Sequence, residues 1–587
     1  MKRYYGVVIL IIAFIITGFW LGKKLIWDIN KTVSFSYPFG NALFPPEFPP
    51  PVFRWVCQTC DSPLWKIELT SPMSDFSIVD TVSGNSYQPA LDDWEKLKRT
   101  SGFRKIRARL SELASERKMR GKALTKLHFR FSNDSVGAPI LYREIPLPFV
   151  FAEANPDSMS YRLVDVGSVN PPHTVMKKFM VCGNCHSSSN NGKIIGLDFD
   201  AAHRDKGGYF IAELSDSIVF DTSNYLSWNK MQDQKTFGMF SKVSPNGRYV
   251  ATTISDRVIA HNFGYDVERL PFSQLFFPVN GVLAIYDRET GKLKELTGAD
   301  LPEYVQSNSF WTPDGEFILF VRAKALPYEE NEWDMLLNDR KIIDDFVYGR
   351  RDFKFDICKI PFNNGEGGVA EPVRGASQNG MSNYFPAVSP DGRWLIFCQA
   401  DNYMLLMPDS RLYIVPLEGG KARKLECNLP LMNSWHAWSP NSKWVVYISK
   451  GLSIYSDMFL THIDNRGHAS IPVLLENARK DRRVANYPEF INIDPGYKFN
   501  MIYKYVDIAH IRRALMAGDT LLAKQLYDQF IAQDQYSLAS EYLFLGRFNL
   551  EQKQYREAAR FFKLAYEKDP GDDEIRVLYP MFKGLCE

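Results

Sequence analysis

The N-terminus carries one long apolar run bounded by basic residues. An uncharged, mostly apolar stretch runs from Tyr4 to Gly22, and Lys23 and Lys24 follow it. As a helix rising about 1.5 Å per residue, this stretch approaches the thickness of a bilayer core. It exceeds the usual signal-peptide core and lacks a small-residue cleavage site. We therefore expect an uncleaved transmembrane signal-anchor over 1–24. A cleaved signal peptide is the alternative, and a buried core helix is the third interpretation.

The next part of the chain, residues 25–155, is first proline-rich and then alternates between apolar and polar residues. Residues 25–51 end in the string Phe44-Pro45-Pro46-Glu47-Phe48-Pro49-Pro50-Pro51, which predicts a stiff, extended tether. Beyond it, Leu64–Leu69 and Leu127–Phe131 alternate between apolar and polar residues as half-buried strands do. The charged stretch from Leu91 to Arg120 is more typical of a helix or a basic loop. We expect a small β-sandwich-like domain over 52–155.

An internal repeat gives the clearest fold signal. The string Ser389-Pro390-Asp391-Gly392-Arg393 precedes an apolar run, and related strings begin at Ser189, Ser244, Thr312 and Ser439. Such a string predicts a hairpin, because Asp-Gly or Asn-Gly supplies the positive-φ turn between two strands. The string Asn486–Ile491 resembles Asn383–Val388, which enters one of these turns. Five hairpins and this last strand predict a six-bladed β-propeller over 156–500.

The C-terminal segment, 506–587, has a helical pattern. Its large and small residues fall where a tetratricopeptide repeat places its packing positions, namely Leu545, Gly546, Tyr555, Ala558, Phe562, Ala565 and Pro570. The stretch from Ala509 to Gln533 indicates a second, degenerate unit. Such a module binds proteins or simply packs within its own chain, and the sequence does not separate the two. The fold class is therefore mainly β, with a C-terminal α-helical, tetratricopeptide-like module.

Composition changes this interpretation little. The chain carries 70 Lys and Arg against 68 Asp and Glu, a net charge of +2, so nothing electrostatic predicts a nucleic-acid partner. Aromatic residues make up 14% of the chain, which favours β-rich structure.

The motif with the most specific chemistry is Cys182-Gly183-Asn184-Cys185-His186. Two thiols at this spacing can form thioethers to the vinyl groups of one haem, and the adjacent imidazole can then bind the iron. Haem is attached in this way outside the cytoplasm, which agrees with the apolar N-terminal run. We therefore expect one covalent haem c on Cys182 and Cys185, with His186 at the iron. A Cys182–Cys185 disulfide, half of a zinc site and chance are the alternatives.

A second iron ligand is suggested by the repeat. When Ser189 is aligned with Ser439, His186 and His436 occupy the same place in two blades, so both are expected to face the central channel. His436 is the first candidate for the sixth ligand, and a buried, hydrogen-bonded histidine is its alternative. His203 is the second candidate because it is close in sequence. Met404 and Met407 are expected in the core or a loop.

The other cysteines predict less. Cys57-Gln58-Thr59-Cys60 lacks a following histidine, so a structural disulfide is expected, with a redox-active dithiol as the alternative. Cys358 and Cys398 lie in apolar, strand-like runs and are expected to be buried.

The Ser-Pro-Asp-Gly-Arg strings resemble the propeller repeats of TolB-type proteins, which also precede prolyl-oligopeptidase domains. The resemblance covers about 160–495 and implies the fold, not an activity. A peptidase is excluded because the chain has no G-x-S-x-G motif and too little sequence after the propeller.

A second resemblance concerns the haem motif and the strings around it. Phe44–Glu47, Phe53–Trp55, Val136–Phe149, Asp198–Asp200 and Asp205–Gly207 flank Cys-Gly-Asn-Cys-His-Ser in an order similar to that of exported propeller cytochromes. These include, more distantly, the propeller-bearing subunit of hydrazine synthase. The resemblance implies a c-type haem on Cys182 and Cys185 beside His186. It implies no catalysis, because this chain has no second C-x-x-C-H motif.

Together these features predict a membrane-tethered, extracytoplasmic monohaem c-type cytochrome that transfers electrons or presents haem within a larger assembly. The expected site is the bacterial inner membrane, with the bulk of the chain in the periplasm. Protein partners are expected at the propeller face or the helical repeats, and the membrane is contacted by the N-terminal helix. A haem-free scaffold and a haem enzyme with an open iron site are the alternatives.

Overall fold

The computed structural model describes residues 33–57, 64–113, 123–177, 183–201, 205–232, 235–262, 274–327, 336–337, 340–506, 508–533, 536 and 538–585. The predicted anchor over 1–24 lies outside these residues, as do Cys60, Cys182 and His203. Within them, no helix has both the length and the apolar character needed to cross a membrane. The chain forms two compact units, one from residues 1–135 with 471–476 and one from 136–470 with 477–587.

The first unit contains two sheets and a helix. One sheet consists of β2 (Ala42–Phe44), β8 (Ala123–Phe131), β7 (Ile106–Glu112), β4 (Leu64–Thr70) and β5 (Ser77–Ser83); the other consists of β1 (Val33–Tyr37), β3 (Phe53–Cys57) and β6 (Ser86–Tyr87); the helix is α2 (Leu91–Ser101). Its core is aromatic, with the Trp94 ring stacked on Phe129 at 5.7 Å. The alternation predicted for Leu64–Leu69 is confirmed, because Trp65, Ile67 and Leu69 are buried.

A short segment from late in the chain completes this unit. Ile471–Glu476, which includes β33 (Val473–Leu474), pairs at Ile471 with Ala42. The Tyr37 hydroxyl accepts a hydrogen bond from the Leu474 backbone N–H at 2.9 Å. Arg54 makes an ion pair with Glu476. The first unit therefore depends on residues more than four hundred positions apart, with a sequence separation of 437 between Tyr37 and Leu474.

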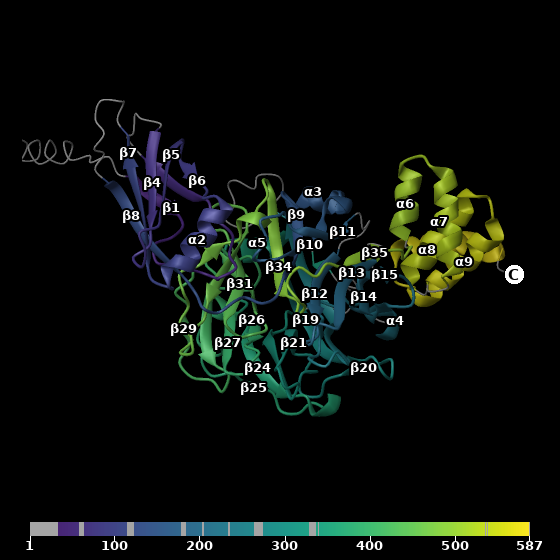
Figure 1. The fold of residues 1–587 in the computed structure, drawn as a ribbon. Helices are drawn as coiled ribbons and strands as arrows, with labels where there is room; N and C mark the ends of the chain where they lie inside the picture. Colours follow the sequence, from purple (N-terminus) through teal and green to yellow (C-terminus); the bar gives the residue numbers. More distant parts are fainter. Residues whose placement is uncertain are drawn as a thin grey trace, which may run out of the picture. The chain divides into compact units, whose positions relative to one another are not determined.

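The second unit is built mainly from successive antiparallel sheets (Figure 1). In chain order they are β12 (Gly183–Ser188), β13 (Ile194–Ala201), β14 (Asp205–Glu213) and β16 (Tyr225–Ser227); β17 (Lys242–Val243), β18 (Tyr249–Asn262), β19 (Gln274–Asp287) and β20 (Lys292–Glu295); β21 (Tyr304–Trp311), β22 (Phe317–Lys324), β24 (Asp356–Pro361) and β25 (Glu371–Pro372); β26 (Ser382–Val388), β27 (Trp394–Ala400), β28 (Arg411–Pro416) and β29 (Arg423–Lys424); and β30 (Asn433–Trp438), β31 (Trp444–Ser449) and β32 (Asp457–His462).

A further sheet joins the two ends of this series. The late strand β34 (Arg483–Phe490) pairs with the early strand β9 (Ile140–Pro146), which continues to β10 (Ser160–Val164) and β11 (His173–Lys177). The strands β12, β17, β21, β26, β30 and β34, called ring strands below, contact one another in this order, and β34 contacts β12. The ring strands therefore close on themselves, which is the organisation of a β-propeller and leaves only short sheet edges.

The predicted hairpins follow the ring strands. At the clearest one, the Ser389 hydroxyl donates to Asp391 Oδ1 at 2.6 Å and accepts from the Trp394 N–H at 3.0 Å. Gly392 has a φ of 71°, which suits glycine. The same hydroxyl bonds recur at Ser189, Ser244, Thr312 and Ser439. The hairpin interpretation of the repeated strings is confirmed at all five positions.

The C-terminal part of the second unit is helical, as predicted. It consists of α6 (Ile508–Met516), α7 (Thr520–Ala532), α8 (Ala539–Glu551), α9 (Tyr555–Lys568) and α10 (Asp573–Phe582). Helices α8 and α9 pack closely at Gly546, where an added Cβ would lie 2.5 Å from the Phe562 ring. The small and large residues noted in the sequence therefore meet across one helix pair.

Candidate functional site

The strand of the haem-attachment motif contains a β-bulge. In β12, Gly183 pairs with Phe199 and His186 pairs with Leu197, so Asn184 and Cys185 together face the single residue Asp198 on β13. Such a bulge locally redirects side chains. Cys182 lies outside the described residues, so the geometry of the motif rests on Cys185 and His186.

His186 is buried between sheets. Its side chain is 1% exposed, and its ring lies edge-on to Tyr161 at 5.8 Å and to Tyr487 at 5.5 Å. Neither ring nitrogen makes a hydrogen bond of good geometry in the described structure, and the Leu141 backbone is the group that acts on the ring as a hydrogen-bond partner. Burial, aided by the charge of Lys242, lowers the pKa of His186 to about 3. The imidazole is therefore neutral at physiological pH, the form in which histidine binds metal ions.

Cys185 is a free cysteine beside this histidine. Burial raises the pKa of its thiol well above the usual value, and the nearby Asp198 carboxylate acts in the same direction. The Tyr487 hydroxyl interacts with the Cys185 sulfur. Cys185 is therefore held as a protonated thiol in contact with the same tyrosine that covers His186.

Charged groups flank this pair of residues. Lys242 on β17 and Glu489 on β34 form an ion pair, and the Lys242 ammonium lies 5.0 Å from the centre of the Tyr487 ring. Asp198 is 5% exposed, and one of its carboxylate oxygens, Oδ1, has no hydrogen-bond partner among the residues described. Burial raises the pKa of Asp198 well above its usual value. The charged groups near β12 are thus the Lys242–Glu489 ion pair and Asp198, whose raised pKa favours the neutral acid.

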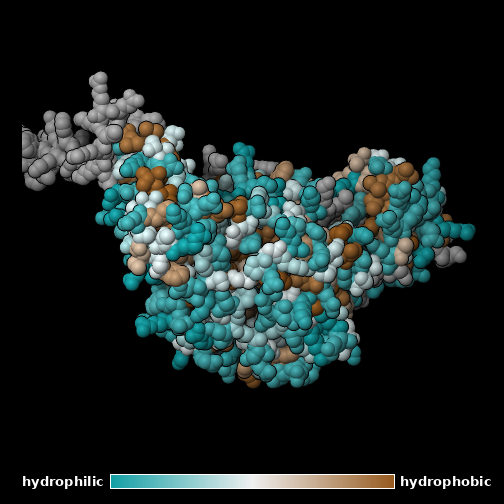
Figure 2. Space-filling view, viewed as in Figure 1, coloured by the Kyte–Doolittle hydropathy of each residue, from teal (hydrophilic) through white to brown (hydrophobic). Residues whose placement is uncertain are grey.

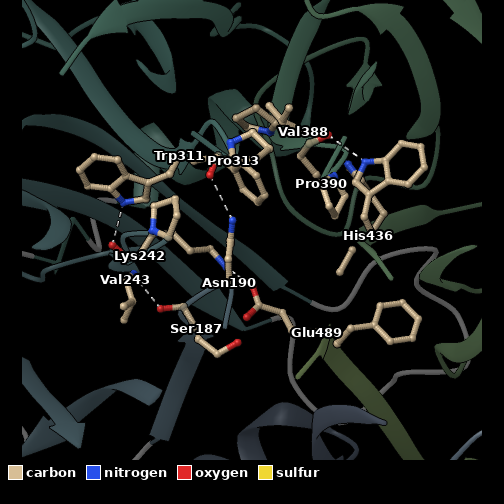
Figure 3. Close-up of a pocket in the computed structure, with 18 of the residues that line it drawn as sticks. Ser187, Asn190, Lys242, Val243, Trp311, Pro313, Val388, Pro390, His436 and Glu489 are labelled. Carbon is tan, nitrogen blue, oxygen red and sulfur yellow. Dashed lines mark hydrogen bonds and ion pairs between the residues drawn. The ribbon is translucent and has the colours of Figure 1, made fainter. Parts of the chain in front are cut away.

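A cavity of about 210 Å³, called the ring cavity below, lies among the ring strands and the turns that follow them (Figure 3). All six ring strands contribute to its wall, among them Ser187 of β12, Trp311 of β21, Phe385 of β26 and Trp435 of β30. Prolines of the repeated turns, such as Pro245 and Pro390, line it as well. The wall is therefore largely aromatic and apolar.

The structure places the two aligned histidines differently. His436 lines the ring cavity, whereas the wall contributed by β12 begins at Ser187 and does not include His186. In β30 the bulge falls between Ser434 and Ala437, so that Trp435 and His436 face one residue of β31. In β12 the bulge lies one residue earlier, and His186 is regularly paired. The expectation that both histidines face one channel is therefore wrong for His186, and the shifted bulge is the physical reason.

Contacts between aromatic side chains link the surroundings of His186 to those of His436. His186 contacts Tyr487, and Tyr487 contacts Trp435, the neighbour of His436, at 6.1 Å. His436 is 8% exposed, and its Nδ1 lies 3.8 Å from Cys398 Sγ. Burial lowers the pKa of His436 to about 4. The role of His436 as an iron ligand stays a prediction, as does that of His203, which lies outside the described residues.

The remaining sulfur-containing residues are accounted for in part. Cys57 is disulfide-bonded, and its expected partner Cys60 lies outside the described residues. Cys358 and Cys398 are buried, as predicted. Met404 and Met407 are buried, which agrees with a core or loop position. Within the described ranges, no group of three or more His, Cys, Asp or Glu side chains could hold a metal ion.

Three wall residues were missed in the sequence, namely Tyr487, Trp435 and Lys242. A sequence signal existed for two of them, because Trp435, like Phe385, lies four residues before a turn serine and Tyr487-Pro488 matches Phe385-Pro386. In the structure Phe385, Trp435 and Tyr487 share a positive φ of 53°, 43° and 53°. Lys242 had none, since its ion pair with Glu489 joins residues 247 positions apart.

Comparisons with known proteins give weak likenesses. No family model matches the chain, and no curated protein matches its sequence. TolB from Acinetobacter baumannii is 13% identical with a TM-score of 0.36, over 66% of this chain and 79% of that one. A putative TolB from Agrobacterium tumefaciens is 14% identical with a TM-score of 0.32, over 61% and 99%. Hydrazine synthase from Kuenenia stuttgartiensis is 13% identical with a TM-score of 0.30, over 51% and 88%. Identities this low concern the fold alone.

Proposed function

We propose that this protein is a monohaem c-type cytochrome built on a six-bladed β-propeller. It would transfer electrons or present haem within a larger assembly. Cys182 and Cys185 would hold the haem through thioethers, and His186 would bind the iron. The haem, when bound, supplies a one-electron redox centre whose potential depends on the axial ligands and on burial.

The observation that carries the proposal is the state of His186. A buried imidazole in a folded protein normally makes hydrogen bonds, yet neither nitrogen of His186 makes one of good geometry among the described residues, and the Leu141 backbone is the group that acts on the ring as a hydrogen-bond partner. Its low pKa keeps the ring neutral, so a lone pair is available. Binding to a metal ion would satisfy such a nitrogen. Cys185, with its protonated thiol, immediately precedes His186 in the sequence. This state of Cys185 and His186 supports the proposal.

The surroundings would act on the haem through charge and packing. The rings of Tyr161 and Tyr487 both pack against the His186 ring, which restricts its orientation. The Lys242–Glu489 ion pair and Asp198 place charged or ionisable groups beside Cys185. Asp198 in its neutral form adds no charge to this site. These residues would therefore orient the iron ligand and limit the access of water.

The wider architecture is part of the same proposal. We count the six sheets of the ring strands as six blades, with the sheet β34–β9–β10–β11 as the blade that joins the two ends of the propeller. We assign α8 and α9 to a tetratricopeptide-like repeat and the apolar run over 1–24 to a membrane anchor, with the propeller in the periplasm. The C-terminal helices expose apolar side chains such as Met516, Leu521 and Met581, and apolar patches are visible over these helices (Figure 2). These helices are the proposed docking surface for a protein of the assembly.

The proposal is tested by a pyridine haemochrome spectrum of protein produced in cells with an active cytochrome c maturation system. A spectrum of the thioether type is expected, and it should disappear in the Cys182→Ala/Cys185→Ala variant. Cys398→Ala is the matched control, since that cysteine is free, as Cys185 is, but lies in another sheet. Absence of haem despite active maturation would contradict the proposal and leave a haem-free scaffold.

The spin state of the iron separates two forms of the proposal. Low-spin, six-coordinate iron is expected for electron transfer, and His436→Ala and His203→Ala then identify the sixth ligand by conversion to high-spin iron. High-spin iron in the unaltered protein that binds small ligands would instead indicate a haem enzyme with an open site.

A further inference from the structure

The wall of the ring cavity carries aromatic rings without net charge. Its one cation and one anion in the described structure, Lys242 and Glu489, are paired with each other. The broad surfaces are the rings of Trp311, Phe385, Trp435 and Trp438 and several prolines. Such a wall does not select for an ion.

Two neighbouring side chains in this wall have unsatisfied polar atoms. The indole N–H groups of Trp311 and Trp438 donate to backbone carbonyl oxygens, those of Lys242 at 3.2 Å and Ala387 at 3.1 Å. Trp435 Nε1 is buried and has no hydrogen-bond partner within the described ranges. His436 Nε2 is buried and makes no hydrogen bond of good geometry there, and the Ile396 and Phe385 backbones are the groups that act on the ring as hydrogen-bond partners. Trp394 also has an unpaired indole N–H, so this feature alone marks no site. Trp435 and His436 differ from Trp394 because they line a cavity.

The bulge in β30 places these two groups on one wall. Successive residues of a regular strand point to opposite faces of the sheet, but Trp435 and His436 lie together between the paired residues Ser434 and Ala437. Trp435 has a φ of 43°, a conformation that it shares with Phe385 and Tyr487 at the bulges of their own strands. Both side chains consequently reach the same cavity, and Figure 3 shows His436 there opposite Lys242 and Glu489.

The chemistry of the two groups indicates what could occupy the cavity. An indole N–H only donates a hydrogen bond, whereas a neutral imidazole nitrogen donates or accepts according to its tautomer. A hydroxyl group satisfies both, because it is a donor and an acceptor at once. The aromatic and proline surfaces favour a compact ring with apolar C–H faces. A volume of about 210 Å³ lies below the roughly 300–1,000 Å³ of sites for drug-sized ligands, so one ring fits better than several.

We propose that the ring cavity binds one sugar ring of an uncharged carbohydrate, with hydroxyl groups on Trp435 Nε1 and His436 Nε2. This site uses neither Cys182 nor Cys185, and it requires that a residue other than His436, such as His203, is the sixth ligand of the haem iron. The exposed amides of Asn190 and Asn492 lie at the same cavity and would meet the outer hydroxyls of the sugar.

Isothermal titration calorimetry tests the proposal, since it works with or without haem. The probes are glucose, N-acetylglucosamine and the disaccharides maltose and chitobiose, with glucuronate as the charged comparison. At least one neutral sugar should bind in the millimolar range or tighter, and glucuronate should bind more weakly than glucose. Equal affinity for a sugar and its disaccharide would assign a free monosaccharide, and tighter binding of the disaccharide would assign the end of a longer chain.

Matched variants locate the site. Trp435→Phe keeps an aromatic ring but removes the N–H, so affinity should fall by roughly 2- to 10-fold, as for the loss of one hydrogen bond. His436→Leu should weaken binding to a similar extent, and His436→Gln, which keeps a polar group, should weaken it less. Trp394→Phe removes an unpaired N–H outside the cavity and should leave affinity unchanged.

Three results would overturn the proposal. They are no heat of binding from any neutral sugar with the folded protein, binding of glucuronate more tightly than glucose, and equal weakening by Trp394→Phe and Trp435→Phe. The Cys182→Ala/Cys185→Ala variant should bind the sugar as the unaltered protein does, which separates failure of this site from failure of the haem proposal.

Discussion

Strands β12 and β30 share the same turn and the same histidine position, but their histidines have different surroundings. Both are ring strands that end in a Ser-containing turn with the same side-chain hydrogen bonds, at Ser189 and Ser439. Both carry a histidine three residues before that serine. Yet His186 is covered by Tyr161 and Tyr487, whereas His436 lines the ring cavity.

The difference comes from where each bulge lies. In β30 the bulge contains His436 itself, and in β12 it contains Cys185 and leaves His186 regularly paired. Because strand side chains alternate between faces, a shift of one residue reverses which side chains face the cavity. Equal spacing from a turn therefore does not guarantee an equal place in a propeller. The first sheet becomes suited to holding a group outside the cavity, and the fifth to holding one inside it.

Acid stability distinguishes the two histidines most strongly. In the haem-free Cys182→Ala/Cys185→Ala background, each histidine is neutral when folded but takes up a proton near pH 6.5 when unfolded. The unfolded state thus binds more protons, and stability falls as the pH falls from 6.5 towards the folded pKa. With folded pKa values of about 3 and about 4, His186 should account for about 4–5 kcal/mol of this loss and His436 for about 3 kcal/mol.

Urea unfolding as a function of pH measures these two contributions. His186→Asn should flatten the stability curve between pH 6.5 and 3, and His436→Asn should flatten it less, between pH 6.5 and 4. If neither variant changed the loss of unfolding free energy at low pH, this would contradict the buried, neutral state of both histidine rings.

The ion pair beside β12 should be the next largest difference. Lys242→Met leaves the buried Glu489 carboxylate without its partner and should lower the free energy of unfolding by about 3–5 kcal/mol. The double variant Lys242→Met/Glu489→Leu should recover most of that loss, because an apolar pair of similar size replaces the ions. Denaturant unfolding of both variants checks this. Equal destabilisation by the single and double variants would show that the packing of the side chains, not their charge pairing, matters here.

Substitutions in the turns should show the smallest difference in unfolding free energy between the two strands, because the turns have the same hydrogen bonds. Ser189→Ala and Ser439→Ala each remove a hydroxyl that donates one hydrogen bond and accepts another. Each should cost about 1–2 kcal/mol, and the two costs should agree within about 0.5 kcal/mol. Thermal unfolding measures them. A clearly unequal cost would show that the likeness of the two strands ends before the turn.

Local chemistry explains what could be predicted from the sequence. The Ser-Pro-Asp-Gly strings predicted the hairpins because a serine hydroxyl, an Asp or Asn side chain and a positive-φ glycine act within six residues. The buried cysteines and the helical C-terminus were likewise predictable from short patterns. The chain order of the ring strands followed from the spacing of the repeats.

Long-range packing explains what could not be predicted. The one-residue shift of the bulge in β12 depends on pairing with β13, and no residue type in Cys185-His186 marks it. Tyr487 reaches Cys185 and His186 only because β34 returns to lie beside β12. The packing of Ile471–Glu476 in the first unit is similarly invisible to a local pattern, since it depends on Tyr37 and Arg54.

The most direct test of the central claim is peptide mapping of the mature protein by mass spectrometry. Trypsin should release the peptide Phe179–Lys193, which contains Cys182, Cys185 and His186. The account predicts that this peptide carries the mass of one haem and that no peptide from β30 is modified. A Phe179–Lys193 peptide that carries only a Cys182–Cys185 disulfide, from cells that mature other c-type cytochromes, would contradict it.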